Sequence, residues 1–201
     1  MYLKSITGEV IFEGYFHTVK RAMEAAVREH VCLDGVDLRN TNLSQANLDG
    51  AQMKGVCLWG ANLTGVNMSG VEMAGADCRN ANFKDCCLAE SDCSKTDFRG
   101  SYFSNSVLRQ TDLSDAKFSC PSIFNNNLYE VGNLHGAVYS HKGEVECDMS
   151  QTPIIIHGVE KPIILLKDKI LIGHFLYDKG TYQKIITHFL KPIKKENNIQ
   201  F

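Results

Sequence analysis

Three arginines and the only tryptophan of the chain recur at multiples of twenty residues, at Arg39, Trp59, Arg79 and Arg99. A guanidinium group forms paired hydrogen bonds with carboxylates and phosphates, and an indole ring offers a broad apolar contact. Both residue types are enriched among those that dominate the binding energy of protein interfaces. If the fold brings every twentieth residue to one surface, these four side chains form a binding column.

The same arginines have a plainer interpretation as a solvated surface. An aspartate stands two residues before each of them, at Asp37, Asp77 and Asp97, and Lys117 continues the series. Such pairs neutralise each other on a wet face without binding anything. Both interpretations remain open at this stage.

A second set of residues with related spacing is acidic and belongs to an adjacent surface. It consists of Asp34, Glu72, Asp92, Asp112 and Asp115, interrupted by Lys54 and Lys95. Carboxylates in a row could imitate the phosphates of a nucleic acid, since duplex DNA carries one charge per ~1.7 Å of axis. Residues 31–130 hold twelve acidic and eight basic groups, a net charge of −4, which is a much lower density.

Other kinds of chemistry find little support in the sequence. There is no glycine-rich phosphate loop, nucleophile elbow or HExxH helix. The seven histidines are scattered, and only His157, His174 and His188 share a segment, without an evident fourth ligand. We therefore predict no catalytic residue, no bound metal and no cofactor, and expect that the protein is not an enzyme.

The element that must position these side chains is a five-residue repeat. Every fifth residue is apolar, at positions 33, 38, 43, 48, 53, 58, 63, 68, 73, 78, 83, 88, 93, 98, 103, 108, 113, 118, 123 and 128. The residue two before each centre is small from Val31 to Ala116, and the residue directly before is often Asp or Asn. A period of five fits neither a helix nor a strand. We expect the small and the central residue to point inward, and the other three outward.

This pattern resembles the pentapeptide-repeat family, whose motif is Ala-(Asp/Asn)-Leu-X-X. Close matches are ANLDG (46–50), ANLTG (61–65), ADCRN (76–80) and ANFKD (81–85). The resemblance implies a mainly β fold, a right-handed quadrilateral β-helix in which four pentads make one coil. Residues 31–130 would then form about five coils, a prism roughly 24 Å long at strand spacing.

Segments of different composition flank the repeat. Residues 1–30 predict an N-terminal cap, a strand followed by a helix with Thr18 as N-cap and Val19, Met23, Ala26 and Val27 on one face. Residues 131–150 predict a closing segment in which GNLHG (132–136) is a pentad displaced by one residue. Residues 151–201, with three β-rich stretches and a helical end, predict a small C-terminal β-β-β-α module, a candidate for homo-oligomerisation.

The cysteines and the overall composition favour an intracellular folded protein. Hydrophobic residues make up 44% of the chain, charged residues 22%, and the net charge is −2. Of the eight cysteines, Cys78, Cys86 and Cys93 occupy inward positions and predict buried thiols, while Cys32, Cys57 and Cys87 fall beside corners. No apolar run is long enough for a membrane helix.

The order of these segments is similar to that of pentapeptide-repeat proteins from phages and prophages. The matching pieces of the tail are IIIHG (154–158) and ILIG (170–173), followed by His174 where those relatives often have cysteine. This resemblance implies a non-catalytic inhibitor that binds a host protein in the host cytoplasm. Two alternatives stay open: sequestration of a small anionic ligand, such as a signalling nucleotide, and DNA mimicry against a type II topoisomerase or restriction-type nuclease. Neither membrane binding nor direct nucleic-acid binding is expected.

Overall fold

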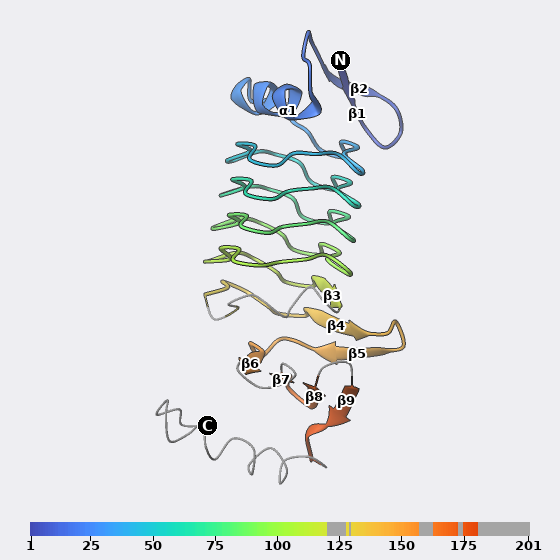
Figure 1. Ribbon diagram of the computed structural model, residues 1–201, viewed down its shortest axis with the longest axis vertical. Coiled ribbons are helices and arrows are strands. Elements are labelled where there is room, and N and C mark those ends of the chain that lie inside the picture. Colours follow the sequence, from blue (N-terminus) through green and yellow to red (C-terminus); the bar gives the residue numbers. More distant parts are fainter. Residues whose placement is uncertain (120–127, 129, 157–162, 173–174, 181–201) are drawn as a thin grey trace. The chain divides into compact units, whose positions relative to one another are not determined.

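The computed structural model describes residues 1–119, 128, 130–156, 163–172 and 175–180 (Figure 1). The chain divides into two compact units, Met1–Thr152 and Pro153–Phe201. The first unit is a stack of flat coils with a helix at its N-terminal end (Figure 1). The second is a small antiparallel sheet.

Parallel backbone pairing between residues twenty apart builds the stack. It joins Asn42 to Asn62, and Asn62 in turn to Asn82. Asn62 N donates to Thr41 O at 2.9 Å, and Leu43 N donates to Asn62 O at 2.9 Å, so each coil bonds to the next through both donor and acceptor groups. The same offset recurs on every side of the prism. Since four pentads make one such offset, the five-residue period becomes a four-sided coil.

The corners of each coil are tight turns with one left-handed residue. The N–H of the small residue donates to the carbonyl of the preceding centre, as in Ala61 N to Leu58 O at 2.9 Å. Two residues after the centre the backbone has positive φ, for example +67° at Gly60 and +58° at Lys95. A turn with positive φ at its third residue favours glycine or asparagine there. The first half of the repeat mostly has glycine at this position, and the second half mostly has polar residues.

The interior is filled by the central and small residues of each pentad. Leucines and methionines of the early coils, such as Leu43 and Met53, have no exposed surface. Bulkier rings fill the later coils, as the sequence predicts. Phe83 stacks on Phe103 at a centroid distance of 4.8 Å, and Phe98 stacks on Phe118 at 5.5 Å.

Hydroxyl groups at the small inward positions are buried together with these rings. Ser91 and Ser101 are at most 2% exposed, and each hydroxyl donates to the carbonyl of the preceding centre at 2.6 Å. Thr111 donates to Leu88 O, one coil earlier, at 2.7 Å. Because every one of these hydroxyls bonds a carbonyl, the interior accepts Ser and Thr in place of Ala without leaving polar groups unsatisfied.

A hairpin covers one side of the first coil. The sequence predicted one strand before the helix, but there are two, β1 (Tyr2–Lys4) and β2 (Val10–Glu13), which pair antiparallel. Asp37 N donates to Lys4 O at 2.8 Å, and Ile6 N donates to Gly35 O at 3.0 Å. The backbone that the first coil would otherwise leave open is thereby bonded on this side.

A helix, α1 (Val19–Arg28), covers the rest of the first coil. Its N-cap is Thr18, whose side chain accepts from Arg21 N as the sequence predicts. Its buried face is made of Met23 and the alanines at 22, 25 and 26, whereas Val19 and Val27 are half-buried at its margin. Lys20 Nζ donates to Ser44 O at 2.9 Å, and Glu24 Oε1 accepts from Asn47 N at 3.2 Å. The helix therefore bonds open backbone groups of the coil edge through side chains.

The repeat slips by one residue after strand β3 (Lys117–Ser119), as GNLHG predicts. In the regular coils the N–H of a central residue donates to the carbonyl nineteen residues on, as Leu43 N does to Asn62 O. Leu113 N instead donates to Asn133 O, twenty residues on, and Leu134 takes the buried central position. The extra residue is absorbed near Gly132. A Cβ there would lie 3.1 Å from the backbone of Gln110, so glycine fits this close approach.

Two further strands end the stack. Strand β4 (Val138–His141) continues β3 in parallel, with Tyr139 buried opposite Phe118, and β5 (Val145–Asp148) returns antiparallel to β4. An antiparallel strand placed on the last parallel one changes the direction of the chain, and the coil path does not continue. Much of the predicted fifth coil, positions 120–127 and 129, lies outside the described residues.

The second unit differs from the predicted β-β-β-α order. It contains four antiparallel strands in the order β6 (Ile154–Ile156), β7 (Ile163–Leu165), β8 (Lys169–Ile172) and β9 (Phe175–Asp178). The stretch KILIGHFLY, predicted as one strand, forms both β8 and β9, because Ile172 pairs with Phe175 and the chain reverses between them. Apolar side chains of the sheet form its own core around Ile163, Leu165 and Ile170. Lys179 and Gly180 are helical, and the rest of the predicted C-terminal helix lies outside the described residues.

The register of the repeat predicts a sharp contrast between neighbouring positions. Leu63 is completely buried, whereas the Thr64 side chain lies at the surface and bonds Asn62. Leu63→Asp should lower the free energy of unfolding by at least ~3 kcal/mol, because it leaves an unpaired charge in a dry interior. Thr64→Asp should change it by less than about 1 kcal/mol. Urea unfolding followed by circular dichroism measures both, and equal stability of the two variants would contradict this register.

Candidate functional site

The structure brings the predicted arginines and tryptophan together on one side of the stack. We call this side the Arg–Trp face, made of Asp37, Arg39, Cys57, Trp59, Asp77, Arg79, Asp97, Arg99 and Lys117. Parallel pairing places Asp37, Cys57, Asp77, Asp97 and Lys117 in consecutive coils. Two positions further along each pentad, Asn40 N donates to Trp59 O, Gly60 N to Arg79 O and Asn80 N to Arg99 O. These bonds place Arg39, Trp59, Arg79 and Arg99 in consecutive coils as well. Trp59 therefore lies between Arg39 and Arg79, in steps of ~4.8 Å.

Each arginine of this face is bound to the aspartate of its own pentad. Arg79 donates from Nε and Nη2 to the two carboxylate oxygens of Asp77, at 2.8 and 2.7 Å. Arg39 and Arg99 make the same fork with Asp37 and Asp97. Arg79 Nε also lies 3.9 Å from an oxygen of Asp97, so neighbouring coils are linked. The ion pairs of the plainer interpretation are present, and they fix the guanidinium groups in place.

The pairing keeps both partners charged. The side-chain hydrogen bond from Arg39 holds the pKa of Asp37 below its usual value, and the bond from Arg79 does the same for the pKa of Asp77. Burial raises the pKa of Asp97, but the hydrogen bonds and charge of Arg99 outweigh burial and the net pKa is lowered. The same bonds raise the pKa of each arginine.

Trp59 interrupts this ladder of ion pairs. In its coil the position of the aspartate is taken by Cys57, which is 7% exposed, and Trp59 itself is 39% exposed. One coil of the face is thus apolar, between charged pairs on both sides. A central apolar contact surrounded by charged groups is the usual arrangement of a protein-binding hot spot.

The predicted acidic residues also share one side of the stack, next to the Arg–Trp face. Glu72, Asp92 and Asp112 lie in consecutive coils. Lys54 Nζ lies 2.9 Å from Glu72 and partly neutralises that carboxylate, whereas Asp34 accepts a hydrogen bond from the backbone N–H of Lys54. Asp92 and Asp112 accept from the backbone of Ser94 and Ser114. Asp115 occupies a left-handed corner of the same side.

Asparagine columns on the remaining sides were not singled out from the sequence. Asn62 Nδ2 donates to Asn42 Oδ1 at 3.2 Å, and Asn67 Nδ2 donates to Asn47 Oδ1 at 3.1 Å, each across one coil. The sequence signal was asparagine recurring twenty residues apart.

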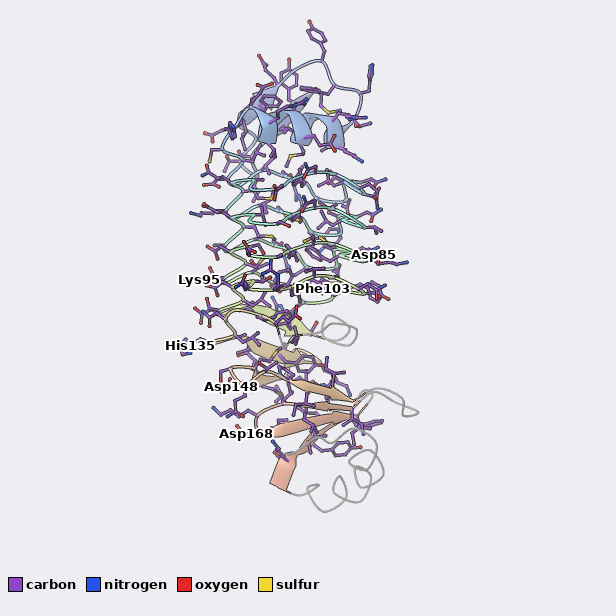
Figure 2. The ribbon with its side chains drawn as sticks, turned by 90° about the vertical axis from the view of Figure 1, so that its left-hand side faces the viewer. Asp85, Lys95, Phe103, His135, Asp148 and Asp168 are labelled. Carbon is purple, nitrogen blue, oxygen red and sulfur yellow. The ribbon has the colours of Figure 1, made fainter. Side chains whose placement is uncertain are left out.

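Figure 2 shows outward side chains such as Asp85 and Lys95 at the margins of the coils, with Phe103 between them.

The cysteines at inward positions are buried, as predicted. Burial raises the pKa of Cys78 and Cys86 above the ordinary thiol value, and raises that of Cys93 to about 12. These thiols are therefore protonated at neutral pH and are poor nucleophiles. Among the described residues no group of His, Cys, Asp and Glu is arranged to hold a metal ion. His157, His174 and His188 lie outside those residues.

Comparison with known proteins supports the repeat. The family model described as "Pentapeptide repeats" matches in eight copies, over residues 32–70, 58–89 and 86–119. The stack thus belongs to the class of mainly β quadrilateral β-helices. The matched residues, 32–119, are those that form the four-sided coils, so the family model and the structure agree on the five-residue repeat. A search of curated proteins found no match.

Several solved structures are similar to part of this chain. A trypsin-treated variant of QnrB1, a plasmid-mediated fluoroquinolone resistance protein, is 10% identical, with 57% of this chain and 67% of that chain covered and a TM-score of 0.41. Rfr23 from the cyanobacterium Cyanothece 51142 is 25% identical, with 45% and 65% covered and a TM-score of 0.26.

HetL, a protein involved in heterocyst differentiation regulation from Nostoc sp. strain PCC 7120, is 21% identical, with 54% of this chain and 57% of that chain covered and a TM-score of 0.26. The chain thus spans less than two thirds of Rfr23 and of HetL. These TM-scores are too low to assign a function. No helix of the described residues is long and apolar enough to cross a membrane.

Replacement of one arginine should report the coupling along the Arg–Trp face. Arg79→Gln should raise the pKa of Asp77, which loses its forked partner, and raise that of Asp97 less, because Arg99 remains bound to it. NMR titration of the carboxyl carbons measures both values. Arg109→Gln, which removes an ion pair with Glu90 on the opposite side, is the control and should move neither.

The sign of the accompanying stability change follows from the lowered pKa values. A carboxylate whose folded pKa is depressed stabilises the fold at pH above its unfolded value, 3.8, and loses that contribution as the pH falls through the folded value. The difference in stability between the parent and Arg79→Gln should therefore shrink in acid. A pH-independent difference would contradict the ion-pair account.

Proposed function

We propose that this protein is a non-catalytic interaction protein that binds a partner protein through the Arg–Trp face. The observation that carries the proposal is the placement of Trp59, 39% exposed, in a row of arginines already fixed by their own aspartates. Fixing a long side chain on binding costs ~0.5–1.5 kcal/mol. Here intrachain bonds have already fixed the arginines, so less of that cost falls on association.

The proposal extends to the origin, the cellular location and the oligomeric state of the protein. The order of an N-terminal hairpin and helix, a pentapeptide stack and a β-rich tail supports a phage- or prophage-encoded inhibitor that binds a host factor in the host cytoplasm. The apolar strands of the second unit support homo-oligomerisation through residues 151–201. Sedimentation of the full-length chain measures that state.

The face gives less support to sequestration of a small anion. Each guanidinium faces a carboxylate of its own coil, so a multiply charged phosphate would meet a row of neutralised pairs. A small anion also cannot span the apolar coil of Trp59 and so cannot use the arginines on both sides of it, which lie ~9.6 Å apart.

DNA mimicry is the second candidate, and one observation favours it. Glu72, Asp92 and Asp112 lie in adjacent coils and present carboxylates in a straight row. The row has steps of ~4.8 Å, compared with one phosphate per ~3.4 Å along a DNA strand. With Lys54 bound to Glu72, the row is short and partly neutral.

Loss of the Arg–Trp face should abolish partner capture. The full-length protein, immobilised and exposed to a host lysate, should retain a partner that Trp59→Ala/Arg79→Ala loses. Each site should contribute ~2 kcal/mol or more, which is a loss in affinity of about thirtyfold. Both residues point outward, so thermal unfolding should change little. Quantitative mass spectrometry compares the captured proteins.

Arg109→Ala is the matched control, since it removes a paired arginine from the opposite side. It should leave capture intact. The acidic side is the binding surface instead if Trp59→Ala/Arg79→Ala captures the same partner as the parent while Glu72→Lys/Asp92→Lys/Asp112→Lys loses it. DNA mimicry further requires that the parent inhibits DNA supercoiling by a topoisomerase and that the triple variant does not.

A further inference from the structure

The Arg–Trp face is layered, with the positive groups outermost. The side chain of Arg39 is 54% exposed and that of its partner Asp37 is 25% exposed. The corresponding values are 46% and 30% for Arg79 and Asp77, and 43% and 20% for Arg99 and Asp97. A molecule that approaches the face therefore meets guanidinium groups before it meets carboxylates.

The formal charge of the face does not favour either sign. Lys117 is exposed and adds a positive charge to the column that contains Asp37, Asp77 and Asp97. Glu146 on β5 lies near enough to Arg99 to help raise the pKa of that arginine. Counting Asp37, Asp77, Asp97 and Glu146 against the three arginines and Lys117, the sum is zero. Selectivity then depends on which groups are outermost, because exposed charges interact with a bound partner at shorter distance than charges beneath them.

Each arginine retains an unused hydrogen-bonding edge. The fork to aspartate engages Nε and Nη2, and within the described residues Nη1 of Arg39, Arg79 and Arg99 makes no hydrogen bond. A guanidinium group has five N–H donors, so its terminal edge, Nη1 with the second hydrogen of Nη2, remains for another acceptor. A carboxylate can accept from that edge with both oxygens. Each arginine is thus able to bridge its own aspartate and one carboxylate of a partner.

The spacing of these donors suits a helix that runs along the stack. Taken from Arg99, the steps to Arg79, Trp59 and Arg39 lie at ~4.8, ~9.6 and ~14.4 Å. Successive turns of an α-helix rise by 5.4 Å and give ~5.4, ~10.8 and ~16.2 Å. Alternate residues of an extended strand give ~6.7, ~13.4 and ~20 Å and lose register within two steps.

We propose that the Arg–Trp face binds an acidic amphipathic helix that lies along the stack, with carboxylates on the three arginines and one apolar side chain against Trp59. This inference rests on the proposed function and names the chemistry of its partner. One carboxylate for each guanidinium matches the single free edge of each arginine. The apolar coil of Cys57 and Trp59 requires an apolar residue at the matching turn of the helix.

The electrostatic part of the inference is tested without any partner. Trp59 is the only tryptophan, so its fluorescence reports on this face alone. Quenching by iodide should exceed quenching by caesium, each normalised to N-acetyltryptophanamide, by about twofold or more at low ionic strength. Arg39→Gln/Arg79→Gln should lower the ratio, because Asp37 and Asp77 remain, and Arg109→Gln should not. A parent ratio of one or less overturns the inference.

Binding is tested with two synthetic helical peptides that lack Trp and Tyr. One carries a glutamate at each matching turn and a single leucine, and the other has lysine at every glutamate position. The acidic peptide should shift Trp59 emission to shorter wavelength in a saturable and salt-sensitive manner. Arg79→Gln should weaken its binding by about tenfold. An equal response to the lysine peptide, or no response to the acidic one, overturns the inference, and so does displacement of the acidic peptide by millimolar phosphate alone.

The two proposals fail in different ways. If the acidic peptide binds as described but Trp59→Ala/Arg79→Ala captures the same proteins as the parent, the proposed function is wrong and the chemical preference of the face stands. If capture depends on Trp59 and Arg79 but iodide has no advantage over caesium, the proposed function stands and the acidic helix is wrong.

Discussion

Backbone hydrogen bonding between residues twenty apart is the constraint on which the rest of this structure depends. Each pentad contributes only one short extended segment and one corner, and neither is stable alone. The bonds from one coil to the next, such as Leu43 N to Asn62 O, fix every residue directly above its equivalent. Side chains are then ordered by position in the repeat, and the chemistry of each side is decided by which residues share a column.

The close spacing of residues within a column limits which charged side chains can follow one another. Like charges ~4.8 Å apart repel each other, and directly opposed like charges destabilise a sheet. On the Arg–Trp face each aspartate is bound by an arginine of the same pentad, and Arg79 also approaches Asp97 of the next coil. Elsewhere the solution is a column of asparagines, which donate and accept in turn. The same bonds that make a charged column tolerable also hold its arginines in one geometry, which is what a binding surface needs.

The ends of the stack show how a repeat of this kind is closed. At the N-terminal end β1 bonds the open backbone on one side, and Lys20 and Glu24 of α1 bond it on others. At the other end the one-residue slip near Gly132 is followed by β4 and the antiparallel β5. The slip was visible in the sequence because GNLHG keeps the motif in a shifted phase. The pairing of β8 with β9 was not visible, because ILIGHFLY is apolar except at His174 and contains only one glycine.

The sequence by itself determined the period, the inward positions and the columns, because a strict five-residue pattern leaves one phase in which all the apolar residues are buried. It therefore placed Arg39, Trp59, Arg79 and Arg99 in one row, and the acidic residues next to them. Only the tertiary structure decided how those side chains are arranged: that the guanidinium groups lie outside their aspartates, that Nε and Nη2 are used while Nη1 is not, and that Cys57 leaves an apolar coil beside Trp59. Exposure and hydrogen-bond direction depend on rotamers set by neighbours one coil away, and a one-dimensional pattern contains the identity of those neighbours but not their geometry.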